Sequence, residues 1–386
     1  MKRVYLDYAA TTPTDPRVIE AMSPAFSELW GNPSSIHACG QEARSAVEEA
    51  RGQVASLIAA RSNEVFFTSG GTESDNWAVK GVAFANRARG NHIITSTGEH
   101  HAILESCHFL EEQGFSVTYV PVDRLGMVNP EDIRKAITPK TILVSIMHAN
   151  NEVGTIQPVA EIGRIAKAAG VYFHTDAVQT VGHVPVDVDK MNVDLLSMSA
   201  HKLYGPKGIG ALYIRGGTKI IPILHGGGQE RQGRSGTENV PGIIGFSSAA
   251  GLAQAEMEEE GRRLTVLRDR LIKGILGAID HTRLNGHATS RLPNNVNISF
   301  EYVEGEAVCL NLDLAGICAA TGSACSSESM EASHVLLAMG LSPELARGSL
   351  RLSLGRWSTE EDVKQVLQAL IPVLSRLRAI SPLAKK

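Results

Sequence analysis

The stretch VAEIGRIAKAAGVYFHTD, from Val159 to Asp176, contains the unit that decides the fold. Its first eleven residues place apolar side chains at helical spacing, and Gly170 follows as a residue that commonly ends a helix. The run 171–174 predicts a buried strand, and an acid follows shortly after it. Helices that lead directly into buried strands are typical of a parallel sheet covered by helices.

The same alternation of strand and helix extends over the first two thirds of the chain. Seven runs predict strands, namely 64–68, 92–95, 116–120, 141–147, 171–174, 194–198 and 210–214. The stretches between them, including 72–88 and 101–113, have apolar residues at helical spacing. We therefore expect an α/β fold with a mixed, mainly parallel seven-stranded sheet. Ligands of such sheets bind beyond the carboxyl ends of the strands.

The pattern changes after the glycine-rich segment 225–236. A long helix is predicted over 240–277, and it is followed by strands at 295–300 and 349–354 and helices at 304–314, 331–339 and 359–378. This order predicts a smaller α+β domain. We expect a large domain over residues 13–254 and a small domain formed by residues 1–12 together with 255–386.

Composition narrows the class of ligand. The 386 residues carry 37 basic and 41 acidic side chains, so the net charge of −4 gives no overall attraction to nucleic acid or to anionic membranes. No apolar stretch suits a membrane-spanning helix, and Asp7 interrupts the N-terminus before any apolar leader forms. We expect a cytoplasmic protein with a small-molecule substrate. Five cysteines without a Cys-x-x-Cys spacing argue against a disulfide framework and a zinc ribbon.

Several common motifs are absent. The chain has no G-x-x-x-x-G-K-[ST], no H-E-x-x-H, and no G-x-G-x-x-G after the first predicted strand. Adjacent histidines in GEHH, 98–101, have no matching acidic cluster nearby, so we expect no metal site. The loop TSGGTE, 68–73, instead joins a strand to a helix and exposes backbone N–H groups, as a phosphate site requires. An ordinary N-cap at Thr72 explains the same residues equally well.

Two polar residues directly follow predicted strands. Lys202 precedes a glycine-proline turn in SMSAHKLYGPKG, 197–208, and a lysine in a ligand crevice can form a Schiff base. In isolation a loop lysine is the simpler interpretation, and we apply it to Lys207. For Asp176 taken alone, a helix N-cap is the simpler interpretation. A phosphate loop, an aspartate and a crevice lysine together provide what pyridoxal phosphate needs, since the carboxylate pairs with the pyridinium nitrogen and makes the ring an electron sink.

The whole chain resembles the NifS/IscS-like cysteine desulfurases, a branch of the class V aminotransferases with the type I pyridoxal phosphate fold. The matching motifs are YLDYAATT (5–12), GNPSS (31–35), the loop 68–76, EH (99–100), HANNEVG (148–154), DAVQ (176–179), SAHK (199–202), RSGT (234–237), GSAC (322–325) and RLSLGR (351–356). The resemblance implies an enzyme that takes sulfur from L-cysteine, releases L-alanine and holds the sulfur as a cysteine persulfide. That persulfide is implied to supply iron–sulfur cluster assembly.

The resemblance also implies roles for individual residues. Lys202 is implied to bind the cofactor covalently and later to act as the base at the substrate Cα. Asp176 is implied to face the pyridinium nitrogen, and His100 to stack on the cofactor ring. The other implied cofactor contacts are Gln179 at the phenolic oxygen, and Gly71, Thr72, Ser199, His201 and, from a second subunit, Thr237 at the phosphate.

The implied substrate contacts lie later in the chain. Arg351 is implied to hold the substrate carboxylate as a bidentate pair, with Asn151 beside it. A surface arginine on a strand is the alternative for Arg351, and Arg356 is close enough in sequence to be confused with it. Cys325 has only small residues around it in GSACSS, and the resemblance implies that it attacks the substrate sulfur.

The resemblance further implies a homodimer with active sites at its interface, and a sulfur-acceptor protein such as an iron–sulfur scaffold. Two alternatives remain open: a lyase acting on selenocysteine or cysteine sulfinate, and an inactive partner or scaffold subunit. Lys202 and Cys325, both intact, argue against the inactive subunit. Nitrogenase maturation, general cluster assembly and RNA thiolation differ in partners rather than in chemistry, so the acceptor pathway also stays open.

Overall fold

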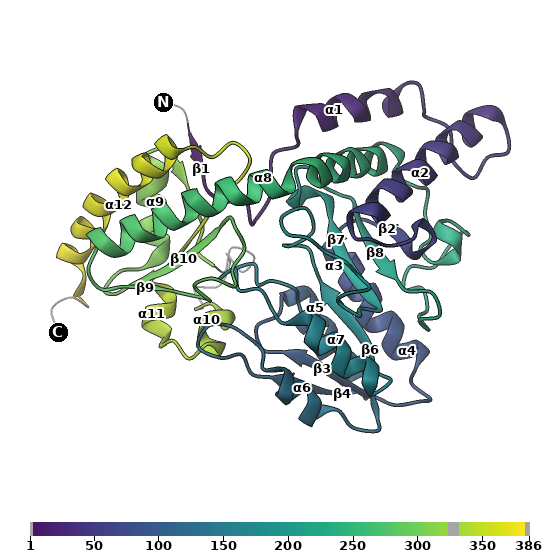
Figure 1. The fold of residues 1–386 in the computed structure, drawn as a ribbon, viewed down its shortest axis with the longest axis horizontal. Helices are drawn as coiled ribbons and strands as arrows, with labels where there is room; N and C mark the ends of the chain where they lie inside the picture. The colour runs from purple at the N-terminus through teal and green to yellow at the C-terminus, as the bar shows by residue number, and fades with distance from the viewer. Residues whose placement is uncertain (1–2, 323–331, 383–386) are drawn as a thin grey trace.

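A mixed seven-stranded sheet forms the centre of the larger part of the molecule (Figure 1). The computed structural model describes residues 3–322 and 332–382. In spatial order the strands are β2 (Val65–Thr68), β8 (Gly210–Ile214), β7 (Leu195–Ser199), β6 (Tyr172–Asp176), β5 (Thr141–Ser145), β3 (His92–Ser96) and β4 (Ser116–Val120). β8 is antiparallel to both of its neighbours, and the other pairs are parallel. All seven strands lie at predicted runs, and the predicted fold class is confirmed.

Helices cover both faces of this sheet because successive strand residues point to opposite sides. The helices are α1 (Pro16–Met22), α2 (Ala38–Leu57), α3 (Gly71–Asn76), α4 (Val82–Ala85), α5 (His101–Glu112), α6 (Pro130–Ala136), α7 (Val159–Ala168) and α8 (Val240–Ala278). One apolar cluster joins the turn Trp77–Gly81, α4 and α5 to one face, and a second joins α2, α6, α7 and the first part of α8 to the other. A π-helical turn, Trp77–Gly81, connects α3 to α4.

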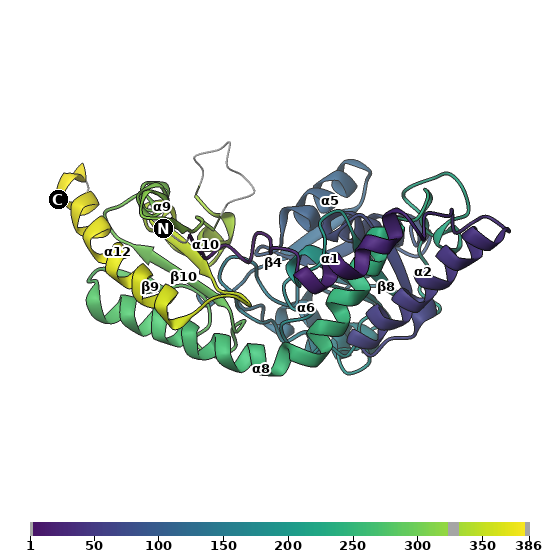
Figure 2. The ribbon, with the colours of Figure 1, turned by 90° about the horizontal axis from the view of Figure 1, so that it is seen from above.

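A smaller part of the molecule packs against one side of the second half of α8 (Figure 2). Its strands are β1 (Val4–Tyr5), β9 (Thr282–Leu284), β10 (Asn295–Phe300), β11 (Ile317–Cys318) and β12 (Ser349–Ser353), arranged as a sheet β12-β10-β9 and a pair β1-β11. Its helices are α9 (Gly305–Leu314), α10 (His334–Ala338), α11 (Pro343–Arg347) and α12 (Glu360–Ile380). The short strands β9 and β11 were not predicted from the sequence.

The long helix α8 contacts both parts of the molecule. Its buried apolar residues within 240–253 belong to the core of the large sheet, and those within 264–275 pack against the small sheet and α12. The domain division after residue 254 stays a prediction, and it falls between these two groups. Within the described ranges, every helix is too short or too polar to cross a lipid bilayer.

Candidate active site

Polar side chains gather on one face of the large sheet, near the carboxyl ends of three neighbouring strands. They are Ser145 on β5, His174 and Asp176 on β6, and Ser197 and Ser199 on β7. They share a face because register partners in a parallel sheet, here Ser145 with His174 and Asp176 with Ser197, point the same way. On this face the strands begin with apolar residues that pack under the turn Trp77–Gly81, α4 and α5. The change to polar residues places a hydrophilic crevice at the sheet edge.

Asp176 ends β6 and is buried. Its Oδ1 accepts a hydrogen bond of 2.9 Å from the Val178 backbone N–H. Burial raises the pKa of Asp176 to about 6, while the Val178 N–H and the charge of Lys202 act to lower it. At neutral pH the carboxyl is therefore ionised, although it lies in a nearly dry site. A buried carboxylate of this kind suits a pyridinium nitrogen.

Lys202 lies in the single helical turn, Ala200–Lys202, that follows β7. Its Nζ donates to the backbone carbonyls of Ala9 and Ala10, each at 2.7 Å. Gln179 donates from Nε2 to the same Ala9 carbonyl at 3.0 Å. The N-terminal segment thus passes directly over the crevice and brings the amine close to Gln179.

His201 is tied to the same N-terminal segment. Its Nδ1 lies 3.0 Å from the Thr11 hydroxyl, and its backbone carbonyl accepts from both the N–H and the hydroxyl of Thr12. Burial, followed by the charges of Lys202 and Lys207, lowers the pKa of His201 to about 4. His201 is therefore a neutral imidazole, and it approaches an anion as a hydrogen-bonding group.

His100 precedes α5 as its N-cap, and its Nδ1 accepts the Ala102 backbone N–H at 3.1 Å. This bond leaves the ring proton on Nε2. Burial first, then the charge of Lys202, lowers the pKa of His100 to about 4, so the ring is neutral at physiological pH. The neighbouring His101 ring lies tilted against the His334 ring, with centroids 4.6 Å apart. A neutral ring beside Lys202 is suited to stacking on a flat cofactor.

The loop before α3 forms a concave backbone surface next to β7. Gly70 adopts φ +155°, a conformation that favours glycine, and a Cβ added there would lie 3.8 Å from the Ser199 hydroxyl. A Cβ added at Gly71 would lie 2.7 Å from Val178 Cγ2. The helix that starts at Gly71 and continues with Thr72 directs its first N–H groups into this space, where an anion can accept them.

Thr237 is exposed on the segment that follows Arg234. This segment is held against α3 by an ion pair of 2.8 Å between Arg234 Nε and Glu73 Oε1. The adjacent Gly236 lines a small hollow together with Ser69. The contact of Thr237 with a second subunit stays a prediction.

Arg351 lies in the middle of β12 with a buried side chain. Its Nη2 is 2.9 Å from Asp7 Oδ1, and its Nη1 donates to the Asn151 backbone carbonyl at 3.2 Å. Its Nε is buried and has no hydrogen-bond partner among the described residues. Buried donors are normally paired, so this one fits a ligand carboxylate.

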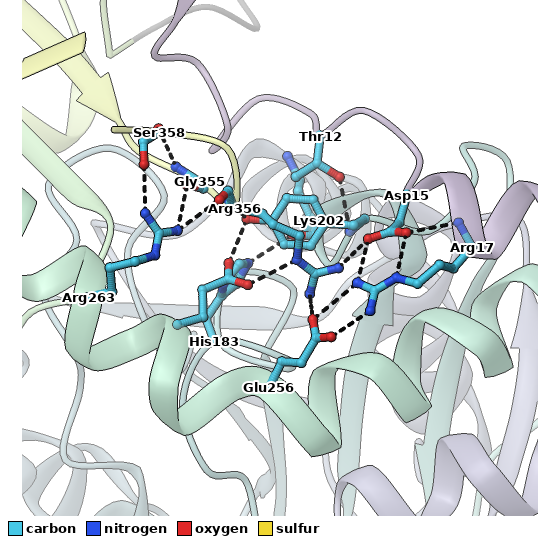
Figure 3. A network of polar contacts seen from close by, with 12 residues as sticks. Thr12, Asp15, Arg17, His183, Lys202, Glu256, Arg263, Gly355, Arg356 and Ser358 are labelled. Carbon is cyan, nitrogen blue, oxygen red and sulfur yellow. Dashed lines mark hydrogen bonds and ion pairs between the residues drawn. The ribbon is translucent and has the colours of Figure 1, made fainter. Parts of the chain in front are cut away.

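Arg356 occupies a different environment (Figure 3). Its guanidinium bonds to Asp15, Glu256 and Glu260 and lies 4.3 Å from the centroid of the Tyr204 ring. These partners occupy the fork that a substrate carboxylate needs. The structure therefore separates the two arginines that the sequence left open to confusion.

Cys325 lies outside the described residues, and its role stays a prediction. Of the other cysteines, Cys107 is buried, Cys309 and Cys318 are half-buried, and Cys39 is exposed. Burial raises the pKa of Cys107 and of Cys309 to about 12, so both thiols stay protonated and unreactive.

Among the buried acids that received no role from the sequence, three lie within the quoted motifs. Glu99 accepts hydrogen bonds from the Ser96 hydroxyl at 2.6 Å and from the Met147 N–H, and burial raises its pKa to about 8. Glu152 accepts from the Ser333 hydroxyl at 2.5 Å. The third acid, Asp75, lies in α3 beneath Asp176. The motif letters of EH, HANNEVG and the loop 68–76 include these acids, but no pattern in the sequence distinguishes them from solvated side chains.

These residues fit pyridoxal phosphate, by the chemistry of the groups that they present. Asp176 offers a carboxylate for the ring nitrogen, Lys202 an amine, and the glycine loop with Ser199 donors for a phosphate. The unpartnered Nε of Arg351 offers a donor for a substrate carboxylate. The fold and the site together define the class of protein, a pyridoxal-phosphate-type enzyme that acts on amino acids.

Comparison with known proteins identifies the family. The chain belongs to the aminotransferase class-V family, which it matches over residues 4–366. It is 59% identical over 385 residues to "Cysteine desulfurase IscS" of Methanosarcina thermophila, covering 100% of this chain and 95% of the relative. The protein of the same name from Dictyoglomus turgidum is 60% identical over 383 residues, covering 99% and 97%. These matches confirm the predicted resemblance.

A solved structure supports the same assignment. The "NIFS-LIKE PROTEIN" superposes with a TM-score of 0.91 at 42% identity, covering 97% of this chain and 100% of that one. Enzymes of this family and the cysteine desulfurases within it depend on pyridoxal phosphate.

Proposed function

We propose that the protein is a pyridoxal-phosphate-dependent cysteine desulfurase, which takes sulfur from L-cysteine and releases L-alanine. The observation that carries the proposal is Arg351, a buried arginine beside the Asn151 carbonyl whose Nε has no partner in the described part of the chain. An α-amino acid brings the carboxylate that this donor lacks. The close, full-length relatives named cysteine desulfurase support cysteine as that amino acid.

The cofactor, when bound, supplies an electron sink that stabilises negative charge at the substrate Cα. Lys202 would bind it covalently and then, as a free amine, remove and return the proton at Cα. Asp176 would hold the ring nitrogen, Gln179 the phenolic oxygen, and His100 would cover one ring face and exclude water. The backbone N–H groups of Gly71 and Thr72, with Ser199, His201 and Thr237 of a second subunit, would hold the phosphate.

Arg351 would hold the substrate carboxylate in place and so set the orientation of the substrate carbon that carries the thiol. The Cys325 thiolate would form a sulfur–sulfur bond to the substrate sulfur as the C–S bond breaks. The electron pair of the broken bond stays with carbon, which takes up protons to give alanine, while the sulfur stays on Cys325 as a persulfide.

The test compares wild type with Cys325→Ser, using Cys39→Ser as the matched control because Cys39 is an exposed cysteine with no assigned role. Purified protein receives L-cysteine, L-selenocysteine or cysteine sulfinate, and alanine and sulfide are measured. We expect wild type and Cys39→Ser to gain the mass of one sulfur on the peptide that contains Cys325. Cys325→Ser should bind cysteine without releasing alanine at a useful rate. Normal alanine release by Cys325→Ser would favour the lyase alternative.

We also propose that the enzyme works as a homodimer and delivers its sulfur to an acceptor such as an iron–sulfur scaffold protein. Thr237 is exposed next to the hollow at the start of α3, which suits a residue offered to a second copy. Sedimentation should give twice the chain mass. A Thr237→Ala variant should stay dimeric and bind the phosphate end of the cofactor more weakly. Transfer of labelled sulfur from the Cys325 peptide to an acceptor thiol tests the delivery step.

A further inference from the structure

Asp75 in α3 is a buried acid that the proposed reaction does not use. Its side chain is 2% exposed, and its Oδ1 has no hydrogen-bond partner among the described residues. The Nε2 of His174 lies 3.7 Å away, beyond the range of a good hydrogen bond. A carboxylate oxygen left unpaired at this depth is costly, whereas the carbonyl oxygen of a neutral acid tolerates the position better.

A continuous row of polar groups connects Asp75 to Asp176. Ser197 is the hydrogen-bonding group that acts on the pKa of Asp75, and its hydroxyl lies 3.0 Å from His174 Nε2. His174 Nδ1 in turn lies 2.9 Å from the Ser145 hydroxyl. Ser197 is the register partner of Asp176, and His174 precedes Asp176 by two residues on the same face. Asp75 therefore lies directly behind the carboxylate that would face the cofactor.

The directions of these hydrogen bonds are consistent with a protonated Asp75. An Asp75 O–H donates to Ser197, whose own proton then goes to His174 Nε2. That leaves the ring proton on Nδ1, where it donates to Ser145. In this arrangement the Asp75 hydroxyl, the Ser197 hydroxyl and both His174 ring nitrogens have partners, one carbonyl oxygen of Asp75 has none, and the Ser145 proton needs an acceptor outside the row. If Asp75 were ionised, Ser197 would donate to it, and His174 Nε2 would have to carry the ring proton.

The charges around Asp75 favour the same state. The titratable groups that bear on it are Asp176 and Glu99, both acids, and His174, whose pKa burial lowers to about 3. Lys202 is the cation that acts on Asp176. Burial first, then the charge of Asp176 and, less strongly, that of Glu99 raise the pKa of Asp75 well above its ordinary value, although the hydrogen bond from Ser197 acts to lower it. Two neighbouring carboxyls without a cation between them do not both ionise in a dry site.

We propose that Asp75 is a positioning residue that, as an uncharged carboxylic acid, confines the single negative charge of this buried row to Asp176. The inference rests on the proposed function in that Asp176 is the partner of the cofactor's ring nitrogen. A second negative charge at position 75 would repel the one on Asp176 and favour its protonation. Asp176 would then lose the charge with which it holds a pyridinium.

The test uses Asp75→Asn, which imitates a neutral acid, and Asp75→Ala, which removes the hydrogen bond to Ser197. Pyridoxal phosphate is titrated into apoprotein, and the absorbance of the bound cofactor is followed against pH. We expect Asp75→Asn to keep the cofactor Kd within about threefold and the pH profile unchanged, and Asp75→Ala to weaken binding about tenfold. Asparagine that weakens binding as much as alanine, or that moves the pH profile, would overturn the proposal.

Infrared spectroscopy reports the protonation state directly, and it keeps the test decisive if Asp75→Ala fails to fold. The wild-type spectrum should contain absorption from protonated, buried carboxylic acids. Asp75→Asn should remove one component of this absorption, and the matched control Glu99→Gln should remove a different component. An Asp75→Asn spectrum that loses carboxylate absorption instead would overturn the proposal. Both measurements are made without cysteine, so they remain valid if the substrate in the proposed function is wrong.

Discussion

Arg351 and Arg356 are five residues apart, yet the partners of their guanidinium groups differ. Arg356 meets three carboxylates, Asp15 at 2.6 Å and Glu256 and Glu260 at 3.1 Å each (Figure 3). Arg351 meets one carboxylate, Asp7, and keeps a buried Nε without a partner among the described residues. The first set of contacts is complete within the chain, and the second is complete only with a ligand.

The acids of the two regions differ in the same way. In the network around Arg356, paired cations lower the pKa of Asp15 and of Glu256. In the crevice, burial without a paired cation raises the pKa of Glu99 and Asp176. Paired acids that join distant segments stabilise the fold, whereas unpaired buried ones are typical of a functional site. The four predictions below test this contrast.

The largest effect is expected at the crevice lysine. Lys202→Ala should lose covalent cofactor attachment and at least about 10² to 10⁴-fold of activity, since a general base at Cα is removed. Lys207→Ala is the control, because the Lys207 amine makes only a long hydrogen bond within the described ranges, 3.5 Å to the Thr12 carbonyl. Borohydride reduction followed by peptide mapping locates the attached cofactor. An adduct on Lys207 would refute the assignment.

The Arg356 network should respond through stability. Arg356→Met leaves Asp15 and Glu260 without this cation and should lower the free energy of unfolding by about 3 kcal/mol. This value is the low end of the range for a buried ion pair, because the third partner, Glu256, is 36% exposed. Denaturant unfolding measures the change, and KM for cysteine should stay unchanged. Arg262→Met, which breaks an exposed pair with Glu258, should cost less than about 1 kcal/mol. Equal losses in both variants would contradict the contrast.

Arg351→Lys should show the opposite response. An ammonium is a point charge that cannot form the planar fork, and a charged hydrogen bond is worth about 1.5 to 3 kcal/mol, so cysteine affinity should fall about 10- to 100-fold. The affinity for the cofactor and the unfolding midpoint should change little. Cysteine titrations of the variant and of wild type measure the difference. Unchanged cysteine affinity would move the carboxylate site away from Arg351.

The sequence predicted the elements whose signal is local. The strands 116–120 and 210–214 have the predicted bounds, because alternating or continuous apolar runs between turns specify a strand by themselves. The same pattern predicts that Asp176 and Lys202 lie at the carboxyl ends of strands, where Asp176 is the last residue of β6 and Lys202 lies in the turn after β7. The two-residue strand β11 and the three-residue β9 carry too few residues for any period to appear.

The rest of the site depends on contacts between distant segments. The Lys202 amine is held by the backbone carbonyls of Ala9 and Ala10. Because these are main-chain groups, the types of the residues that carry them do not reveal the contact. Asp75 approaches His174 across about a hundred residues of chain, and burial alone gives this acid its character. Arg351 and Arg356 look alike in RLSLGR, and their environments separate them only once α8 and the N-terminal segment pack together.

The fourth expected effect is a pH dependence of stability with opposite signs in the two regions. The folded pKa of Glu99 is raised to about 8 from an ordinary value of 4.5, so its contribution is fully present below pH 4.5 and is lost as pH rises toward 8. Glu256 has a lowered folded pKa, so its contribution to the free energy of unfolding is present above its ordinary pKa and is lost as pH falls.

Glu99→Gln keeps a neutral side chain that can accept a hydrogen bond from Ser96, and it should flatten the decline in unfolding free energy between pH 4.5 and 8. Glu256→Gln should leave that range unchanged and flatten the decline at acid pH instead. Denaturant unfolding across this pH range measures both slopes. A Glu99→Gln curve parallel to wild type from pH 4.5 to 8 would show that Glu99 ionises as freely as a solvated acid, and the contrast between the two regions would then rest on the arginines alone.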